Sequence, residues 1–122
     1  MYISVDGDDI GKDLELHIIK NDLKGAEIYS QKIDLAFNYL VNAVKKTWGA
    51  EISFFGGDNF IFFINNEDLE MNFFKEICNN FFELSGKTIS VGIGNTPRES
   101  YLSLKFAKLS GKNQIRRYGE LN

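Results

Sequence analysis

Two apolar, β-rich runs separated by only three residues constrain the fold more than any other feature of the sequence. Residues 51–55 and 59–64 have the composition of strands, and Gly56-Gly57-Asp58 joins them. A short link that contains glycine between two such runs is typical of a β-hairpin, because glycine adopts turn conformations that other residues avoid. The chain must therefore contain antiparallel strands, and its other segments have to pack around this hairpin.

Segments on both sides of the hairpin alternate between strand-like and helix-like patterns. Residues 2–6 alternate polar and apolar side chains, whereas residues 26–48 repeat their apolar positions about every four residues, which is the period of an amphipathic helix. Residues 12–23 are interpreted as helical or irregular. The full pattern predicts strands at residues 2–6, 51–55, 59–64, 88–94 and 114–118, and helices at residues 26–48, 66–85 and 97–110.

The strand at residues 88–94 and the segment after it carry two further signals. Ser90, Gly92 and Gly94 share one face of this strand, so we expect another segment to approach its backbone closely. Thr96-Pro97-Arg98-Glu99 then has the features of a helix start, with Thr96 as the cap and Glu99 completing a capping box.

The order of the first six elements, βαββαβ, predicts an α+β fold of the ferredoxin-like kind, with helices packed on an antiparallel sheet. With 122 residues, 43% of them hydrophobic, the chain is long enough for one core. It contains one proline and no Gly/Ser-rich linker, so we expect residues 1–122 to form a single domain. This plan places the end of the first strand beside the hairpin.

Charge and hydropathy exclude several classes of partner. The formal net charge of −3 argues against binding to long nucleic acid, which usually requires a basic face. No apolar run approaches the length of a membrane span, and the first residues do not resemble a signal peptide. The one cysteine, Cys78, cannot form an intrachain disulfide. We therefore expect a cytoplasmic protein without a membrane partner.

Aspartates gather at the two points that this fold brings together. Asp6, Asp8 and Asp9 follow the first strand, and Asp58 lies at the tip of the hairpin beside two glycines. Carboxylate oxygens from neighbouring strands suit Mg²⁺, which completes its shell with water and phosphate oxygens. Asp and Gly are also common turn residues, so either cluster alone is explained by turn formation. The two clusters at adjacent strand ends together favour a metal site.

Four segments resemble those of a known superfamily. Residues 6–11 (DGDDIG) and 54–60 (FFGGDNF) resemble the two metal motifs of GGDEF-type cyclases and of CRISPR palm polymerases. Residues 88–94 (TISVGIG) and 107–113 (AKLSGKN) resemble the strand and the closing basic motif of GGDEF domains. The short length and the DGDDIG opening are most similar to the minimal CRISPR polymerase (mCpol) group, palm domains linked to antiviral nucleotide signalling.

The resemblance implies a role for each motif residue. It implies that Asp6, Asp58 and Asp8, with the Gly7 carbonyl, ligate Mg²⁺ or Mn²⁺, and that Asn59 belongs to the catalytic set. It also implies a nucleotide-binding set made up of Gly7, Ile10, Gly11, Gly56, Gly57, Lys108 and Lys112. The two lysines would neutralise the triphosphate, although cations near a helix C-terminus are favoured by the helix dipole in any case.

The sequence departs from the GGDEF pattern at two informative positions. Asn59 stands where GGDEF cyclases carry a second acid, so it offers a carbonyl oxygen without a charge. Leu14 falls near the asparagine of guanine-specific cyclases. An adenine nucleotide is therefore at least as compatible as a guanine nucleotide, and the mCpol resemblance favours ATP.

These observations lead to one main hypothesis and two alternatives. The main hypothesis is a Mg²⁺-dependent nucleotidyltransferase that makes a cyclic di- or oligonucleotide signal in antiphage defence, acting as a homodimer because a ring of two nucleotides needs two facing sites. In the first alternative, Asn59 marks a degenerate site that binds a nucleotide or cyclic nucleotide as a sensor. In the second, the chain is a structural domain that pairs with another protein.

Overall fold

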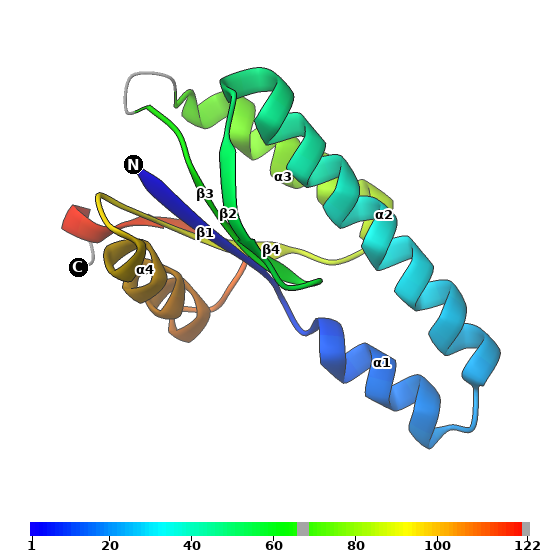
Figure 1. The fold of residues 1–122 in the computed structure, drawn as a ribbon. Helices are drawn as coiled ribbons and strands as arrows, with labels where there is room; N and C mark the ends of the chain where they lie inside the picture. The colour runs from blue at the N-terminus through cyan, green and yellow to red at the C-terminus, as the bar shows by residue number, and fades with distance from the viewer. Residues whose placement is uncertain (66–68, 121–122) are drawn as a thin grey trace.

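The computed structural model describes residues 1–65 and 69–120, which form one five-stranded sheet with helices on both faces (Figure 1). The elements are β1 (Tyr2–Gly7), α1 (Ile10–Ile19), α2 (Leu23–Trp48), β2 (Glu51–Phe55), β3 (Asn59–Phe63), α3 (Met71–Ser85), β4 (Ile89–Gly94), α4 (Pro97–Leu109) and β5 (Ile115–Arg117), followed by a 3₁₀ turn at Tyr118–Glu120. The predicted order of strands and helices is confirmed. The segment interpreted as helical or irregular forms α1, which begins at Ile10.

The strand order is β2-β3-β1-β4-β5, and its first four strands are antiparallel, as the ferredoxin-like plan predicts. The sheet is nevertheless mixed, because β5 pairs with β4 in parallel. The reason is the connection: α4 carries the chain back along the sheet between β4 and β5, and a helical crossover joins parallel strands. The expectation of an antiparallel sheet is thus wrong for the last strand alone.

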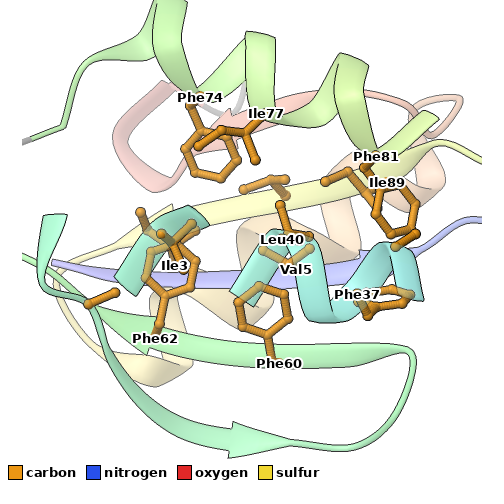
Figure 2. Close-up of a cluster of buried hydrophobic side chains, with 14 of the residues drawn as sticks. Ile3, Val5, Phe37, Leu40, Phe60, Phe62, Phe74, Ile77, Phe81 and Ile89 are labelled. Carbon is orange, nitrogen blue, oxygen red and sulfur yellow. The ribbon is translucent and has the colours of Figure 1, made fainter. Parts of the chain in front are cut away.

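Helices α2 and α3 cover one face of the sheet and enclose the hydrophobic core (Figure 2). Aromatic side chains fill much of it: Phe37 of α2 meets Phe81 of α3 edge-on at 4.8 Å between ring centroids, and Phe60 and Phe62 of β3 stack at 5.5 Å. The expected start of the second helix at residues 66–68 lies outside the described residues. Within them, α3 begins at Met71 and ends at Ser85, and Gly86 caps it with a positive φ of 72°.

Helix α4 packs on the opposite face, against β4 and β1 (Figure 1). Its contact with β4 is backbone to backbone: a Cβ built on Gly92 would lie 2.1 Å from the Ser100 carbonyl oxygen and 2.2 Å from the Leu104 nitrogen. The close approach expected at this strand is therefore the docking of α4. Thr96 caps α4 as predicted, since its hydroxyl accepts a hydrogen bond from the Glu99 backbone N–H at 3.1 Å. The predicted capping box is not formed, because the Glu99 carboxylate accepts from the Asn95 N–H at 3.0 Å and not from that of Thr96.

Helices α1 and α2 form a hairpin that projects from the end of β1 (Figure 1). The Asp22 carboxylate caps α2 by accepting a hydrogen bond from Gly25 N at 2.9 Å and lies 3.0 Å from His17 Nδ1. Tyr29 ties the two helices together by donating its hydroxyl proton to the Ile10 carbonyl at 2.9 Å. None of the helices in the described parts of the chain has both the length and the apolarity that crossing a membrane requires.

Candidate active site

The end of β1 and the β2–β3 hairpin lie side by side. Asp6 is paired with Asn59 in the sheet register, and the Gly7 backbone N–H donates to the Asp58 carbonyl oxygen at 2.9 Å. The structure thus brings together the two aspartate clusters, which are 52 positions apart in the sequence. Gly7 is required sterically, because a Cβ at this position would lie 2.5 Å from Ile10 Cγ1.

The Asp6 carboxylate lies in an environment that opposes its charge. Burial raises the pKa of Asp6 above its usual value, and the nearby Asp58 charge raises it further, while the Lys108 ammonium offsets part of this shift. A carboxylate whose ionisation is opposed by burial and by a neighbouring negative charge is stabilised by a cation placed beside it. The electrostatics of Asp6 therefore favour a bound cation.

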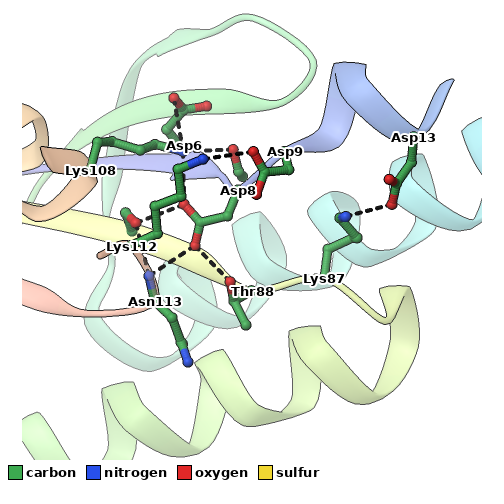
Figure 3. Close-up of polar contacts among 11 residues, drawn as sticks. Asp6, Asp8, Asp9, Asp13, Lys87, Thr88, Lys108, Lys112 and Asn113 are labelled. Carbon is green, nitrogen blue, oxygen red and sulfur yellow. Dashed lines mark hydrogen bonds and ion pairs between the residues drawn. The ribbon is translucent and has the colours of Figure 1, made fainter. Parts of the chain in front are cut away.

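One such cation is supplied by the chain itself. The Lys108 ammonium, reaching over from α4, donates to the Gly7 carbonyl at 2.8 Å and to Asp8 Oδ1 at 2.8 Å, and lies 3.4 Å from Asp6 Oδ2 (Figure 3). The position between the Gly7 carbonyl and the Asp6 carboxylate consequently attracts positive charge. The Gly7 carbonyl and the Asp6 carboxylate are oxygen donors that already hold a cation, so they fit the Mg²⁺ or Mn²⁺ ion that the resemblance implies.

Asp8 has different surroundings from Asp6, although only Gly7 separates them. It is 3% exposed, and its Oδ1 accepts from Ser90 Oγ and Lys108 Nζ, while its Oδ2 accepts from Thr88 Oγ1 and the Asn113 backbone N–H (Figure 3). Burial alone would raise its pKa, but the hydrogen bonds from Lys108, Thr88 and Ser90 outweigh burial and hold the pKa of Asp8 below its usual value. Asp8 therefore joins β1, β4 and the segment after α4, and its role as a metal ligand remains a prediction.

The second predicted phosphate-binding lysine lies at the surface. Lys112 pairs with Asp9 at 2.6 Å, and this hydrogen bond lowers the pKa of Asp9 and raises that of Lys112. Lys112 and Asn113 both have positive φ values, 63° and 50°, directly after Gly111 at 112°. Such a run of left-handed residues is strained and is found mainly where function requires it. Here it aims the Asn113 N–H at Asp8.

The hairpin turn itself is open on one side and closed on the other. Gly57 has a φ of 93°, and a Cβ built on it would meet no atom within 4 Å. A Cβ on Gly56, by contrast, would lie 2.7 Å from Asn59 Oδ1. That oxygen is buried and accepts no hydrogen bond from the described residues. Asn59 thus presents a carbonyl oxygen whose bonding capacity is unused within the described part of the chain.

Two cavities flank the hairpin and divide the predicted site residues between them. A cavity of about 230 Å³ between α1, α2 and the hairpin brings together five of them: Ile10, Gly11, Gly56, Gly57 and Asp58. A second cavity of about 220 Å³ lies on the α4 side and includes Asp6, Asn59 and Lys108. Asp58 lines the first cavity and Asp6 lines the second, whereas Lys112 lines neither.

The structure adds residues that sequence reasoning missed. Tyr29, Ser30 and Asp34 of α2 line the first cavity, and Tyr101 and Lys105 of α4 line the second. Ser30 and Asp34 are four residues apart, so their common helical face was a signal present in the sequence. What the sequence did not reveal is that this face of α2 turns toward the hairpin.

Comparison with known families decides the membership of the chain. Residues 2–118 match the family model described as the minimal CRISPR polymerase domain, mCpol. The chain belongs to the mCpol family. The match covers β1 through β5 and therefore both aspartate clusters and the basic segment at residues 107–113 of this mCpol domain.

A solved structure supports the same fold. This mCpol domain is similar to the GGDEF domain of DgcB from Caulobacter crescentus, solved in complex with c-di-GMP, with a TM-score of 0.58 and 13% sequence identity over 98% of this chain and 77% of that one. No curated protein matches the sequence. The family and the structural similarity together assign a palm domain of the nucleotidyltransferase type.

No group of three or more His, Cys, Asp or Glu side chains that could hold a metal ion occurs among the described residues. A divalent ion would therefore take its remaining ligands from backbone, water and substrate. This is the usual pattern for Mg²⁺, which is commonly bound by one or two carboxylates together with substrate phosphates.

Proposed function

We propose that this mCpol domain is a Mg²⁺-dependent nucleotidyltransferase that joins nucleoside triphosphates into a cyclic signalling nucleotide for antiphage defence. One observation carries the proposal: the Asp6 carboxylate and the Gly7 carbonyl lie beside the Asp58 hairpin and already attract a cation, the Lys108 ammonium. A palm domain that gathers oxygen donors at such a point is suited to binding a divalent ion and, through it, a triphosphate.

The residues of the site divide the work of phosphoryl transfer. Asp6, Asp58 and the Gly7 carbonyl would hold the divalent ion, which neutralises charge on the phosphates when bound. Gly57 leaves its side of the turn open for the triphosphate to approach, and Lys112, which is paired with Asp9, would supply a cation to the phosphates. A ribose hydroxyl of a second nucleotide then forms a bond to the α-phosphate, the bond to the β-phosphate breaks, and pyrophosphate leaves.

The cavity between α1 and α2 is the proposed base pocket, and the mCpol resemblance favours ATP as the nucleotide that occupies it. Leu14 lines the cavity, near the position of the asparagine of guanine-specific cyclases, and offers only apolar contact. Ser30 and the Asp34 carboxylate line the same cavity. Asp34 can accept a hydrogen bond from the exocyclic amine of adenine, as it could from the N–H groups of guanine, so the absence of an amide near Leu14 is the feature that speaks against guanine.

We propose a homodimer as the active form, because two sites that face each other can each form one of the two bonds in a ring of two nucleotides. Exposed aromatic side chains beside the site support this. Phe54, Phe55 and Tyr101 are 56%, 46% and 48% exposed. Exposed apolar side chains at the edge of a site are typical of a surface that a partner covers.

The proposal is tested by incubating the purified protein with each nucleoside triphosphate and Mg²⁺ or Mn²⁺ and identifying products by mass spectrometry. We expect a cyclic nucleotide from ATP, and its complete loss in the Asp6→Asn and Asp58→Asn variants. Asp34→Asn is expected to weaken ATP use while leaving metal binding intact. The proposal is wrong if the unaltered protein binds nucleotide but forms no product from any triphosphate.

Asn59 favours one alternative, a nucleotide sensor without turnover, because an amide stands where the related cyclases carry an acid. The Asn59→Asp variant separates the two functions in the same assay. A gain of product from an inactive protein would identify a degenerate enzyme that now acts as a sensor. Loss of product from an active protein would show that the neutral amide is adapted to catalysis.

A further inference from the structure

Lys108 uses the same oxygens as the proposed metal ion. An ammonium group has three N–H donors, and three oxygens surround that of Lys108: the Gly7 carbonyl at 2.8 Å, Asp8 Oδ1 at 2.8 Å and Asp6 Oδ2 at 3.4 Å. Two of these three, from Gly7 and Asp6, belong to the ligand set of the divalent ion. A lysine that neutralises a triphosphate has to point at phosphate, whereas this one points at the metal ligands.

We propose that Lys108 is a built-in competitor of the divalent ion, so that metal and triphosphate bind cooperatively. The inference rests on the proposed function, since it concerns the metal ligands of that same site. A divalent ion on Asp6 and the Gly7 carbonyl repels an ammonium held by the same oxygens, and Lys108 must leave them. The triphosphate offers the displaced ammonium new anionic oxygens, so each ligand makes the other bind more tightly.

Asp8 is the residue that holds Lys108 in place. Its carboxylate is buried and fixed from three directions, by Thr88 Oγ1 at 2.7 Å, by Ser90 Oγ at 2.7 Å and by the Asn113 N–H at 3.0 Å. A fixed anion holds the flexible lysine stem over the Gly7 carbonyl. Asp8 thereby influences metal binding through Lys108 without needing to touch the ion.

The neighbouring lysines do not share this arrangement. Lys112 is paired with Asp9. Lys105 lies one turn before Lys108 on α4, and its ammonium is 5.5 Å from the centroid of the Tyr101 ring. Neither forms an ion pair with Asp6 or Asp8 among the described residues. Lys105→Met therefore removes the same charge from the same helix without freeing the metal ligands, and it is the matched control for Lys108→Met.

The test measures the affinity of the protein for Mn²⁺ alone, from the electron paramagnetic resonance signal of free Mn²⁺. We expect Lys108→Met to bind Mn²⁺ at least about fivefold more tightly than the unaltered protein, and Lys105→Met to stay within about twofold of it. Circular dichroism confirms that each variant is folded. Lys108→Gln serves if Lys108→Met does not fold, and the same tightening is expected.

A second titration measures the coupling. With the nonhydrolysable analogue α,β-methylene-ATP present, and with the Mn²⁺ affinity of the analogue itself measured separately, the unaltered protein should gain roughly 5- to 150-fold in Mn²⁺ affinity. The gain should be several-fold smaller in Lys108→Met, because no lysine remains to be transferred from the metal ligands to the phosphates.

Unchanged or weaker Mn²⁺ binding in both Lys108 variants, relative to Lys105→Met, would overturn the inference. So would failure of Mn²⁺ to bind any variant at millimolar concentration. These measurements involve no turnover and are therefore separate from the product assay. A protein that yields no cyclic product but shows the tightening refutes the proposed function only, and one that yields product without the tightening refutes the competition only.

Discussion

At the scale of single residues, the site places two aspartates in opposite environments two positions apart. Asp6 is a carboxylate whose charge the fold opposes, and Asp8 is one whose charge the fold stabilises. A residue that is costly to the folded state yet lies beside a cation is typical of a functional position, because structure alone gives no reason to keep it. Asp8 instead has the bonding of a structural anchor.

This contrast predicts opposite effects of removing the two charges. Asp6→Asn should leave the free energy of unfolding unchanged or raise it, because the folded state disfavours the charge. Asp8→Asn should lower it by about 3 kcal/mol or more, since the variant leaves the Lys108 ammonium without its buried partner. Urea unfolding of both variants at neutral pH measures the two changes. Marked destabilisation by Asp6→Asn would contradict the assignment.

The pH dependence of the free energy of unfolding should also differ between Asp6 and Asp8. The pKa of Asp8 is lowered on folding, so its stabilisation is present above the unfolded value of 3.8 and is lost as pH falls through the lower folded value. The pKa of Asp6 is raised, so its contribution has the other sign, and stability is lost as pH rises from 3.8 through the higher folded value. The Asp8→Asn variant should therefore lose less stability than the unaltered protein when the pH is lowered below 3.8.

The residue scale also shows where sequence reasoning reaches its limit. The sequence predicted that Asp6 lies beside the Asp58 hairpin, because the order of strands predicts which strands pair, and pairing of the first strand with the hairpin brings their ends together. The bonding of Asp8 could not be predicted in this way. Its partners Thr88, Ser90 and Asn113 come from segments at least 80 positions away. The residues that surround a buried carboxylate are determined by tertiary packing, and the local sequence around that carboxylate does not reveal them.

At the scale of elements, the position of α4 decides whether the site is complete, because α4 carries Lys108 to the end of β1. The capping residues at 96–99 predicted where this helix starts, and the glycines of β4 predicted that something would lie close to the strand. The direction of β5 was predicted wrongly, because a short strand pattern is identical in both directions. Direction follows from the crossover that α4 makes.

Gly92 is the point at which this docking is most sensitive. A Cβ there would lie 2.1 Å from the Ser100 carbonyl and 2.2 Å from the Leu104 nitrogen, and both are backbone atoms of α4. We expect Gly92→Ala to lower the free energy of unfolding by about 2–3 kcal/mol, the upper range for overpacking. It should also weaken nucleotide binding, because α4 and Lys108 shift together. Thermal unfolding and nucleotide titration measure the two effects.

Gly49→Ala is the control for that experiment, because Gly49 also has a positive φ, 63°, and a Cβ built there would meet no atom within 4 Å. Alanine is strained at this φ, but Gly49 caps the end of α2, at the other end of β2 from the Asp58 hairpin, so the strain leaves α4 and that hairpin in place. If the docking of α4 sets the position of Lys108, Mn²⁺ affinity changes in Gly92→Ala and not in Gly49→Ala. Equal changes in both variants would show that α4 does not set the position of Lys108.

At the scale of the whole molecule, the palm fold supplies one site per chain, with Asp58 and Asp6 lining two different cavities and its exposed aromatic residues beside them. One site can form one bond at a time, whereas a ring of two nucleotides contains two. Either a single site acts twice on the same intermediate, or two chains each form one bond. The proposed homodimer corresponds to the second possibility, and the fold alone is compatible with both.

Mixing active and inactive chains distinguishes these two possibilities. If equal amounts of the unaltered protein and Asp58→Asn exchange subunits freely, roughly a quarter of the dimers retain two working sites. We expect cyclic product per total chain to fall to about that fraction, with a linear dinucleotide accumulating from mixed dimers, because each of these can form one bond but not the other. Independent chains would instead give about half the product and no excess of the linear species. The same mixture made with Asp6→Asn should behave identically, since each variant removes one proposed metal ligand from one site.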